Sequence, residues 1–234
     1  MAATHAPAHH GHVEGEDEVF HQYKDLAQQN ESYIVGMWTF LVTEVMFFGG
    51  LFMAYAIYRW MYQEDFYKVH RTLSITWGGI NTFVLLTSSF SMAMAVYFAQ
   101  LKKRKQQLMA LGFTMACAFG FLFIKIIFEW KGKFEHGLLP GPAFTYPYHG
   151  IDEVAGTAKP GIAQMFYSLY FAMTGLHGLH VVVGILVIAT LMYMTVKKYP
   201  QVENYIPTEM VGLYWHFVDL VWIFLYPLFY LIPK

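Results

Sequence analysis

Long apolar stretches separated by short polar segments dominate the pattern along the chain. A helix needs about 20 mostly apolar residues, at about 1.5 Å per residue, to cross the hydrocarbon core of a bilayer. The stretches that meet this length are residues 34–58, 75–100, 108–128, 162–196 and 211–232. The pattern therefore predicts an all-α, polytopic membrane protein that forms a bundle of five transmembrane helices.

The fourth stretch, residues 162–196, is longer than a perpendicular crossing requires. We expect it to tilt strongly or to begin as an interfacial segment near Ala163. Aromatic side chains such as Trp60, Trp77 and Trp130 stand near the ends of the stretches. Amphipathic rings prefer the level of the lipid headgroups, so these positions agree with the predicted span limits.

The first part of the chain has a different pattern. Residues 1–30 contain no apolar stretch and combine small and acidic residues with histidines. The histidines are His5, His9, His10, His12 and His21. We expect a solvated, His-rich extension rather than a metal-binding tail. The predicted organisation is an extension over residues 1–30 and a transmembrane domain over residues 31–234.

Composition agrees with a membrane protein. Hydrophobic residues make up 56% of the chain and charged residues 13%, whereas soluble domains carry about 25% charged residues. The formal net charge of −1 provides no basic surface for a nucleic acid. Cys117 is the one cysteine, which excludes an intrachain disulfide and a Cys-rich metal centre.

The orientation in the membrane is predicted from the short loops. The run from Lys102 to Lys105 and the pair Lys197 and Lys198 fall on the same side as the N-terminus. Basic residues on the opposite side are about as numerous but more dispersed. Because the dense run lies closest to the membrane, we expect the N-terminus in the cytoplasm and the C-terminus outside. The Gly- and Pro-rich segment 131–161 is then the long external loop.

Glu44 is an ionisable residue near the middle of the first stretch. Its neighbours three and four positions away are apolar: Phe40, Leu41, Phe47 and Phe48. Such surroundings favour the neutral carboxyl group. The residue is either a protonatable functional group or a protonated acid that hydrogen-bonds a neighbouring helix.

Two further polar pairs lie near the ends of spans. Lys125 and Glu129 are four residues apart at the end of the third stretch, where we expect an ion pair near the interface. His216 and Asp219 open the fifth stretch, and we expect either a mutual pair or a polar anchor to another subunit. No nucleophile, phosphate-loop or zinc-protease motif occurs, so we predict no catalytic residue.

His177 and His180 lie one turn apart in the fourth stretch and share a face with Thr174 and Gly184. Small residues allow close helix approach, and imidazoles hydrogen-bond across it. We expect His177 to pack this stretch against the first. A metal site would need a third ligand from another span, such as His216 or Glu44. Helix packing is the favoured interpretation, with no metal ligand on this chain.

Several segments, taken together, resemble subunit III of haem–copper terminal oxidases. Residues 43–48 read TEVMFF, residues 81–89 NTFVLLTSS, residues 125–130 KIIFEW, residues 174–181 TGLHGLHV and residues 214–222 YWHFVDLVW. They are similar, in order, to the family's acid-containing helix, its NTxxLLxSS segment, its acid followed by an aromatic residue, TGxHGxHV and YWHFVDxVW. The longer members carry two more helices before the first of these segments, so the resemblance is to the short, five-helix form.

The resemblance implies an accessory subunit of a proton-pumping cytochrome c oxidase, without a redox centre of its own. Haem and copper are expected on partner subunits, and phospholipid is expected on this chain. The implied partners are subunit I, as the main contact, subunit II, other respiratory subunits and membrane lipids. The implied role is to support subunit I by packing, lipid binding and sustained proton uptake, in the cytoplasmic membrane of a bacterium.

Site residues follow from the same resemblance. Glu44 corresponds to the family's buried acid, and His177, His180, His216 and Asp219 correspond to its polar helix-packing set. We expect the two acids, Glu44 and Asp219, to meet these imidazoles, with Glu44 close to the fourth stretch.

Other functions stay open at this point: subunit III of a quinol oxidase, an accessory subunit of a nitric oxide reductase, or an independent proton-coupled transporter. Cytochrome c is favoured as the electron donor because the quinol branch often has aspartate at the position of Glu44.

Overall fold

The computed structural model describes residues 22–148, 150–199, 202 and 204–232. The five histidines of the predicted extension lie outside these residues. All regular secondary structure in the described part of the chain is helical.

Within the described residues, five helices are long and apolar enough to cross a membrane. They are α1 (Leu26–Met61), α3 (Ile75–Gln100), α4 (Arg104–Ile124) with its continuation, α7 (Pro160–Lys197) and α8 (Ile206–Tyr230). Helix α4 continues through a π-helical segment, η1 (Lys125–Trp130), into α5 (Lys131–Glu135). The five predicted spans are therefore confirmed, and the chain is a polytopic, all-helical membrane protein.

The helix ends differ from the predicted ones. Helix α1 begins at Leu26, inside the segment assigned to the extension, because the Asp25 carboxylate caps it by accepting from the backbone N–H of Gln28 at 2.8 Å. Helix α7 is continuous from Pro160 over 38 residues. Its first turns are not a separate interfacial segment, since Phe166 is buried edge-on against Phe66.

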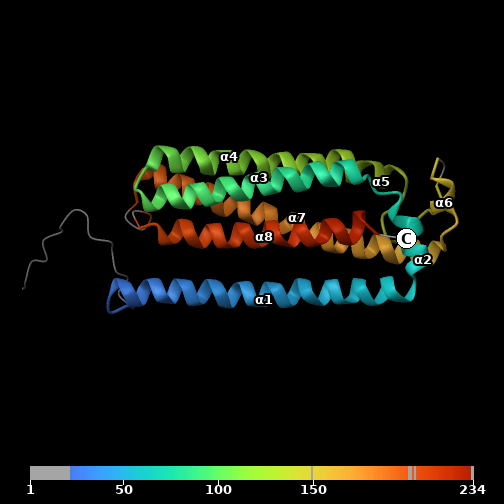
Figure 1. Cartoon of the computed structure of the whole chain (residues 1–234), viewed down its shortest axis with the longest axis horizontal. Helices are drawn as coiled ribbons and strands as arrows, with labels where there is room; N and C mark the ends of the chain where they lie inside the picture. Colours follow the sequence, from blue (N-terminus) through green and yellow to red (C-terminus); the bar gives the residue numbers. More distant parts are fainter. Residues whose placement is uncertain (1–21, 149, 200–201, 203, 233–234) are drawn as a thin grey trace, which may run out of the picture.

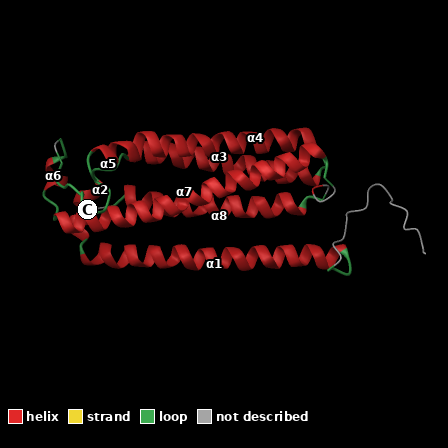
Figure 2. Cartoon of the chain, turned by 180° about the vertical axis from the view of Figure 1, so that it is seen from behind, coloured by secondary structure: helices red, strands yellow, loops and turns green. Residues whose placement is uncertain are grey.

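The long helices lie side by side and nearly parallel (Figure 1). Helices α3 and α4 make the closest pair, and α8 packs against α3, α7 and α1. Seen from both sides, α1 lies along one edge of the bundle (Figures 1 and 2). Half of the most apolar stretch of α8 is buried, against 17% for α1. Helix α8 is thus central, and α1 is the most peripheral span.

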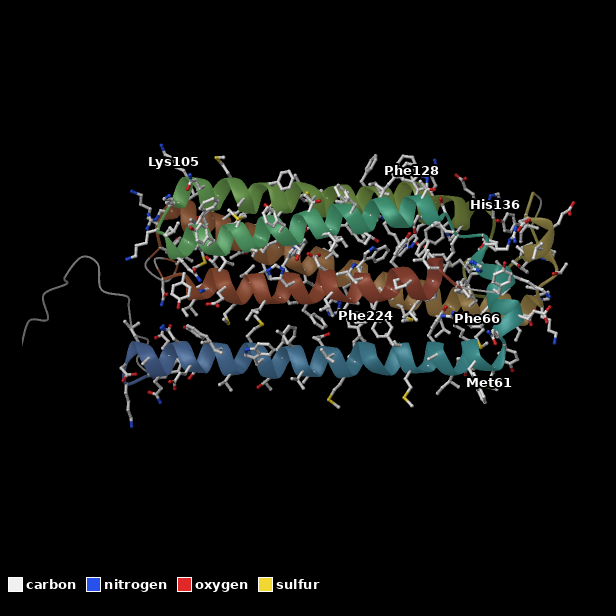
Figure 3. The ribbon with its side chains drawn as sticks, viewed as in Figure 1. Met61, Phe66, Lys105, Phe128, His136 and Phe224 are labelled. Carbon is white, nitrogen blue, oxygen red and sulfur yellow. The ribbon has the colours of Figure 1, made fainter. Side chains whose placement is uncertain are left out.

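The core is built mainly from large aromatic and aliphatic side chains around α8. Trp215, Trp222 and Phe229 are fully buried there. By contrast, many apolar side chains of α1 point away from the other helices (Figure 3), and Val35, Met46 and Met53 are each more than 60% exposed.

The two ends of the bundle differ. We call one the capped end, because the short helices α2 (Gln63–His70) and α6 (Glu153–Gly156) cover the helix ends there. Arg71 Nε contacts Asp152 Oδ2 at 2.6 Å, and the Tyr146 hydroxyl donates to the carbonyl of Ala155. The predicted long loop therefore folds back on the bundle. The other end, which holds Lys105, is called the basic end (Figure 3).

Candidate functional site

Glu44 and His180 form a polar contact between α1 and α7. His180 Nε2 lies 3.1 Å from Glu44 Oε2, and His180 Nδ1 lies 2.8 Å from the carbonyl oxygen of Leu176. A carbonyl only accepts, so Nδ1 carries a proton. The Nε2–Oε2 hydrogen bond then requires one more proton, which resides on either atom. In both forms the pair has no net charge, which is how it is tolerated in the middle of a span.

The surroundings of this pair are aromatic. The ring of Phe48 lies edge-on to His180, with centroids 5.3 Å apart, and the Tyr214 hydroxyl donates to the carbonyl of His180 at 3.0 Å. The side chains of Glu44 and His180 are 19% and 16% exposed. The expected meeting of Glu44 with the fourth span is confirmed. The pair is partly open at the surface of this chain rather than sealed inside it.

His177 occupies a different environment from His180. It is buried, and its ring packs against Phe121 of α4 and Trp222 of α8. The expectation that His177 packs α7 against α1 is wrong. Three residues advance a helix by about 300°, so the two rings leave α7 in directions about 60° apart. Only His180 reaches α1.

His216 bonds to α3 and not to Asp219. His216 Nδ1 lies 2.7 Å from Ser89 Oγ, and no hydrogen bond or ion pair joins the described residues His216 and Asp219. The predicted mutual pair is therefore wrong. Asp219 is buried and faces Ser89 and Cys117. The physical reason is that the Ser89 hydroxyl on α3 offers His216 a partner, which the sequence of α8 by itself cannot reveal.

Lys125 and Glu129 form the expected ion pair, Nζ to Oε2. Both residues are only 3% exposed, so the pair is enclosed among the helices. Lys125 Nζ also contacts the hydroxyls of Tyr170 at 3.0 Å and Tyr230 at 2.8 Å. The ring of Trp222 lies 4.7 Å from the same nitrogen. The π-helical turn thus directs both charges into the bundle.

Sequence reasoning missed three members of this cluster. Lys133 Nζ donates to the backbone carbonyl of Glu129 at 3.1 Å, and the hydroxyls of Tyr170 and Tyr230 both bond Glu129 Oε2. Lys133 repeats the four-residue spacing of Lys125 and Glu129, and that spacing could have identified it. The tyrosines stand in apolar spans with no pattern that marks them.

The intramembrane imidazoles do not converge. His177 faces α4 and α8, His180 faces α1, and His216 faces α3. Among residues 22–148, 150–199, 202 and 204–232, no three or more His, Cys, Asp or Glu side chains are placed to hold one metal ion.

Comparison with known proteins shows which proteins this chain is similar to. Residues 143–233 match the family model for cytochrome c oxidase subunit III. Cytochrome c oxidase subunit 3 of Synechocystis is 29% identical over 235 residues, covering 99% of this chain and 84% of the relative. A probable quinol oxidase subunit 3 of Staphylococcus epidermidis is 29% identical over 205 residues, with 85% and 88% covered. The chain is therefore similar to subunit III of haem–copper oxidases over most of its length.

A third relative is a fusion. The haem–copper oxidase subunit I+III of Aeropyrum pernix is 29% identical over 205 residues, which cover 84% of this chain and 22% of the relative. The range that matches the family model, residues 143–233, includes His177, His180, His216 and Asp219. Glu44, Lys125 and Glu129 lie before this match, in the part of the chain that the alignment with the Synechocystis relative covers.

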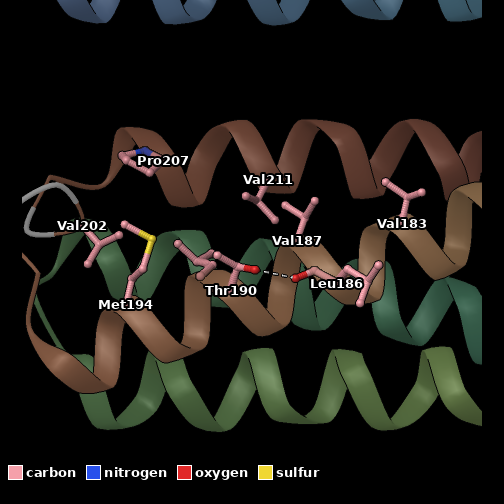
Figure 4. Close-up of a pocket in the computed structure, with 9 residues that line it drawn as sticks. Val183, Leu186, Val187, Thr190, Met194, Val202, Pro207 and Val211 are labelled. Carbon is pink, nitrogen blue, oxygen red and sulfur yellow. Dashed lines mark hydrogen bonds between the residues drawn. The ribbon is translucent and has the colours of Figure 1, made fainter.

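Apolar cavities lie among the helices at the basic end. One of about 670 Å³ lies between α1 and the ends of α7 and α8, where Tyr33, Met37, Phe40, Met194 and Met210 are among its lining residues. A second, of about 370 Å³, lies between α7 and α8 and is lined by Val183, Leu186, Val187 and Val211 among others (Figure 4). Their linings suit hydrocarbon chains rather than polar ligands.

Proposed function

We propose that this chain is the accessory subunit III of a proton-pumping cytochrome c oxidase that reduces O2 to water, and that it carries no redox centre. The observation that carries the proposal is the divergence of its imidazoles. In the described part of the chain, His177, His180 and His216 each serve a different helix contact. A dinuclear haem–copper centre, or a haem held by two histidines, would need imidazoles directed at a common centre. We therefore assign haem and copper to partner subunits.

Subunit I is the proposed main partner. The Aeropyrum relative is named as a fusion of subunits I and III, which supports a direct association. The peripheral, apolar face of α1 offers surface for a membrane partner. Subunit II and other respiratory subunits complete the proposed complex.

The Glu44–His180 pair supports a role in sustained proton uptake. It holds one exchangeable proton between Oε2 and Nε2, near the middle of α1, and is partly open at the surface of the chain. An uncharged pair that exchanges a proton without creating a lone charge is suited to the membrane interior.

The cavities at the basic end support phospholipid binding. Their apolar linings lie beside α7, whose end carries Lys197, and this places hydrocarbon contacts next to a positive charge. We propose that acyl chains occupy them.

Quinol is the second candidate electron donor. The quinol oxidase relative from Staphylococcus epidermidis is as similar to this chain as the cytochrome c oxidase relative from Synechocystis, at 29% identity each. The glutamate at position 44 favours cytochrome c.

The membrane is proposed to be the bacterial cytoplasmic membrane, with the basic end in the cytoplasm and the capped end outside. The dense basic run at Lys102–Lys105 supports this orientation.

Purification of the tagged chain in mild detergent, followed by visible spectroscopy, tests the proposal. We expect a larger haem-bearing chain to accompany it and to be reduced by cytochrome c. Recovery of a colourless chain that transports protons alone in liposomes would instead establish a transporter. Reduction of the haem by a quinol but not by cytochrome c would establish the second candidate.

A further inference from the structure

Asp219 of α8 is a carboxyl group buried inside the bundle without a counter-charge. The residue is only 2% exposed. Among the described residues, neither of its carboxyl oxygens has a hydrogen-bond partner, and no ion pair includes it. A lone carboxylate is costly in the interior of a membrane protein. We therefore expect Asp219 to carry a proton.

The groups that face Asp219 from the neighbouring helices are neutral. Ser89 comes from α3 and Cys117 from α4. On α7, the buried ring of His177 packs against Trp222, which lies one turn further along α8 than Asp219. None of these side chains supplies the positive charge that an ionised Asp219 would need.

Neither a cation of the described chain nor a metal ion takes the place of the proton. Lys125 lies 4.7 Å from the ring of Trp222, but Glu129 neutralises it. No three or more His, Cys, Asp or Glu side chains converge on one ion in the part of the chain that the structure describes. A proton is thus the ligand that suits this carboxyl group.

The hydroxyl of Ser89 connects Asp219 with the surface of the bundle. It faces Asp219, and its oxygen also lies 2.7 Å from His216 Nδ1. His216 stands three residues before Asp219 on α8 and is partly exposed. A hydroxyl group both donates and accepts hydrogen bonds, so it can pass a proton between two neighbours. The three side chains therefore lead from the buried carboxyl group to a partly exposed imidazole.

We propose that Asp219 is a proton-binding site inside the bundle, and that Ser89 and His216 form its hydrogen-bonded path to the surface. In the protonated state the Ser89 hydroxyl donates to His216 Nδ1, and a small rotation of the Asp219 side chain directs its O–H at Ser89 Oγ. Release moves two protons together, one from Asp219 to Ser89 Oγ and one from Ser89 to His216 Nδ1.

The state formed by this step holds an Asp219 carboxylate and a His216 imidazolium. Their charges are opposite, so the transfer creates no net charge inside the membrane. His216 then releases the proton on Nε2 at the bundle surface, and rotation of its ring carries the Nδ1 proton outward in turn. Uptake follows the same steps in reverse.

This site is separate from the Glu44–His180 pair. That pair joins α1 to α7, whereas Asp219 lies among α3, α4 and α8. The proposal rests on the placement of the chain in a membrane, and on neither the electron donor nor the haem.

Infrared spectroscopy of the intact complex tests the proposal through the C=O stretching band of a protonated carboxyl group. The band that disappears in Asp219→Asn belongs to Asp219, and transfer of the wild type to D2O should shift it. We expect Ser89→Ala to slow this shift about tenfold, because the hydroxyl group that joins Asp219 to His216 is lost. His216→Phe should slow it similarly. Ser89→Thr keeps a hydroxyl group and should stay close to the wild type.

Ser91→Ala is the matched control, because the Ser91 hydroxyl is on the same helix but donates to the carbonyl of Ala110. It should exchange at the wild-type rate. Identical carboxyl bands in wild type and Asp219→Asn would show that Asp219 is ionised and would overturn the proposal. Equal rates in wild type, Ser89→Ala and His216→Phe would also overturn it. If Ser89→Ala does not assemble, His216→Phe against Ser91→Ala decides in the same way. Co-purification of a haem-bearing chain tests the proposed function separately.

Discussion

Ionisable side chains inside the spans of this chain are held in two ways. Glu44 and His180 share one proton, so that neither needs a separate counter-charge. Lys125 and Glu129 are neutralised by each other and surrounded by tyrosine hydroxyls and aromatic rings. The first arrangement tolerates a change of protonation, whereas the second depends on both partners being present.

Replacement of Glu44 by glutamine should leave assembly of the complex nearly intact. The amide donates to His180 Nε2 while His180 Nδ1 keeps its bond to Leu176, so the contact between α1 and α7 persists. Glu44→Ala should lose about 1 kcal/mol, the typical value of one hydrogen bond. Melting of the purified complex measures both. Complete loss of assembly in Glu44→Gln would show that an ionised carboxylate is required.

Replacing both members of the buried ion pair should cost less stability than the sum of the two single replacements. Glu129→Gln leaves the Lys125 ammonium without its carboxylate and should destabilise the protein by about 3 to 5 kcal/mol. Lys125→Met combined with Glu129→Gln should be less destabilising than Glu129→Gln alone, because the Lys125 ammonium is removed together with its carboxylate, while Lys133 keeps its bond to the backbone carbonyl at position 129. Thermal melting of the four forms in detergent gives the coupling. A double variant less stable than either single variant would contradict this account.

At the scale of helices, close packing between α7 and α8 depends on Gly184. A Cβ atom there would lie 2.7 Å from Trp215 Cζ3 and 2.8 Å from Cε3. Gly178, on the same helix, has no atom within 4 Å of the corresponding Cβ position among those considered. The two glycines therefore form a matched pair.

Gly184→Ala should destabilise the protein by about 1 to 3 kcal/mol, because the fully buried Trp215 has to shift. Gly178→Ala should be neutral or stabilising by up to about 1 kcal/mol, since alanine favours the helix and meets no neighbour. Melting temperatures of the two variants, measured side by side, test both expectations. A more stable Gly184→Ala than Gly178→Ala would mean that α7 and α8 are separated further than described.

Burial of His70 in helix α2, at the capped end, predicts that the stability of the protein depends on pH. His70 is buried there, and burial lowers its pKa below the ordinary value, with Arg71 and Arg59 acting in the same direction and the Tyr67 carbonyl opposing them. In the unfolded chain the His70 imidazole takes up a proton near pH 6.5, whereas in the folded chain it does so only at a lower pH. Stability should therefore fall as the pH drops below about 6.5.

The melting temperature of wild type between pH 7.5 and pH 5.5 should fall more than that of His70→Gln, which has no such proton to take up. The difference between the two proteins is the quantity to measure, because it isolates the contribution of the His70 imidazole. Parallel curves for the two proteins would assign the pH dependence to other groups.

At the scale of the whole molecule, orientation can be tested with single cysteines. In a Cys117→Ser background, Gly141→Cys at the capped end should react with a membrane-impermeant maleimide on intact cells. Lys103→Cys at the basic end should react only after permeabilisation. This follows from the placement of the dense basic run in the cytoplasm. The reverse labelling pattern would invert the proposed topology.

The number of the spans and their approximate positions could be predicted from the sequence because lipid imposes a minimum apolar length on each helix. The pairing of Lys125 with Glu129 was also predictable, since a four-residue spacing is a local property of one helix. Partners on other helices were predicted less well. The meeting of Glu44 with α7 was expected, but the directions of His177 and His216 were not.

The sequence by itself thus determined the helices, their polar positions and the likeness to oxidase subunit III. Only the tertiary structure decided which helix each polar side chain meets, placing His177 against α4 and α8, His216 on Ser89, and two tyrosines on Lys125. The physical reason lies in the solvent. In water an apolar stripe shows which face of a helix is buried, but lipid and neighbouring helices are both apolar, so the spans carry no such stripe.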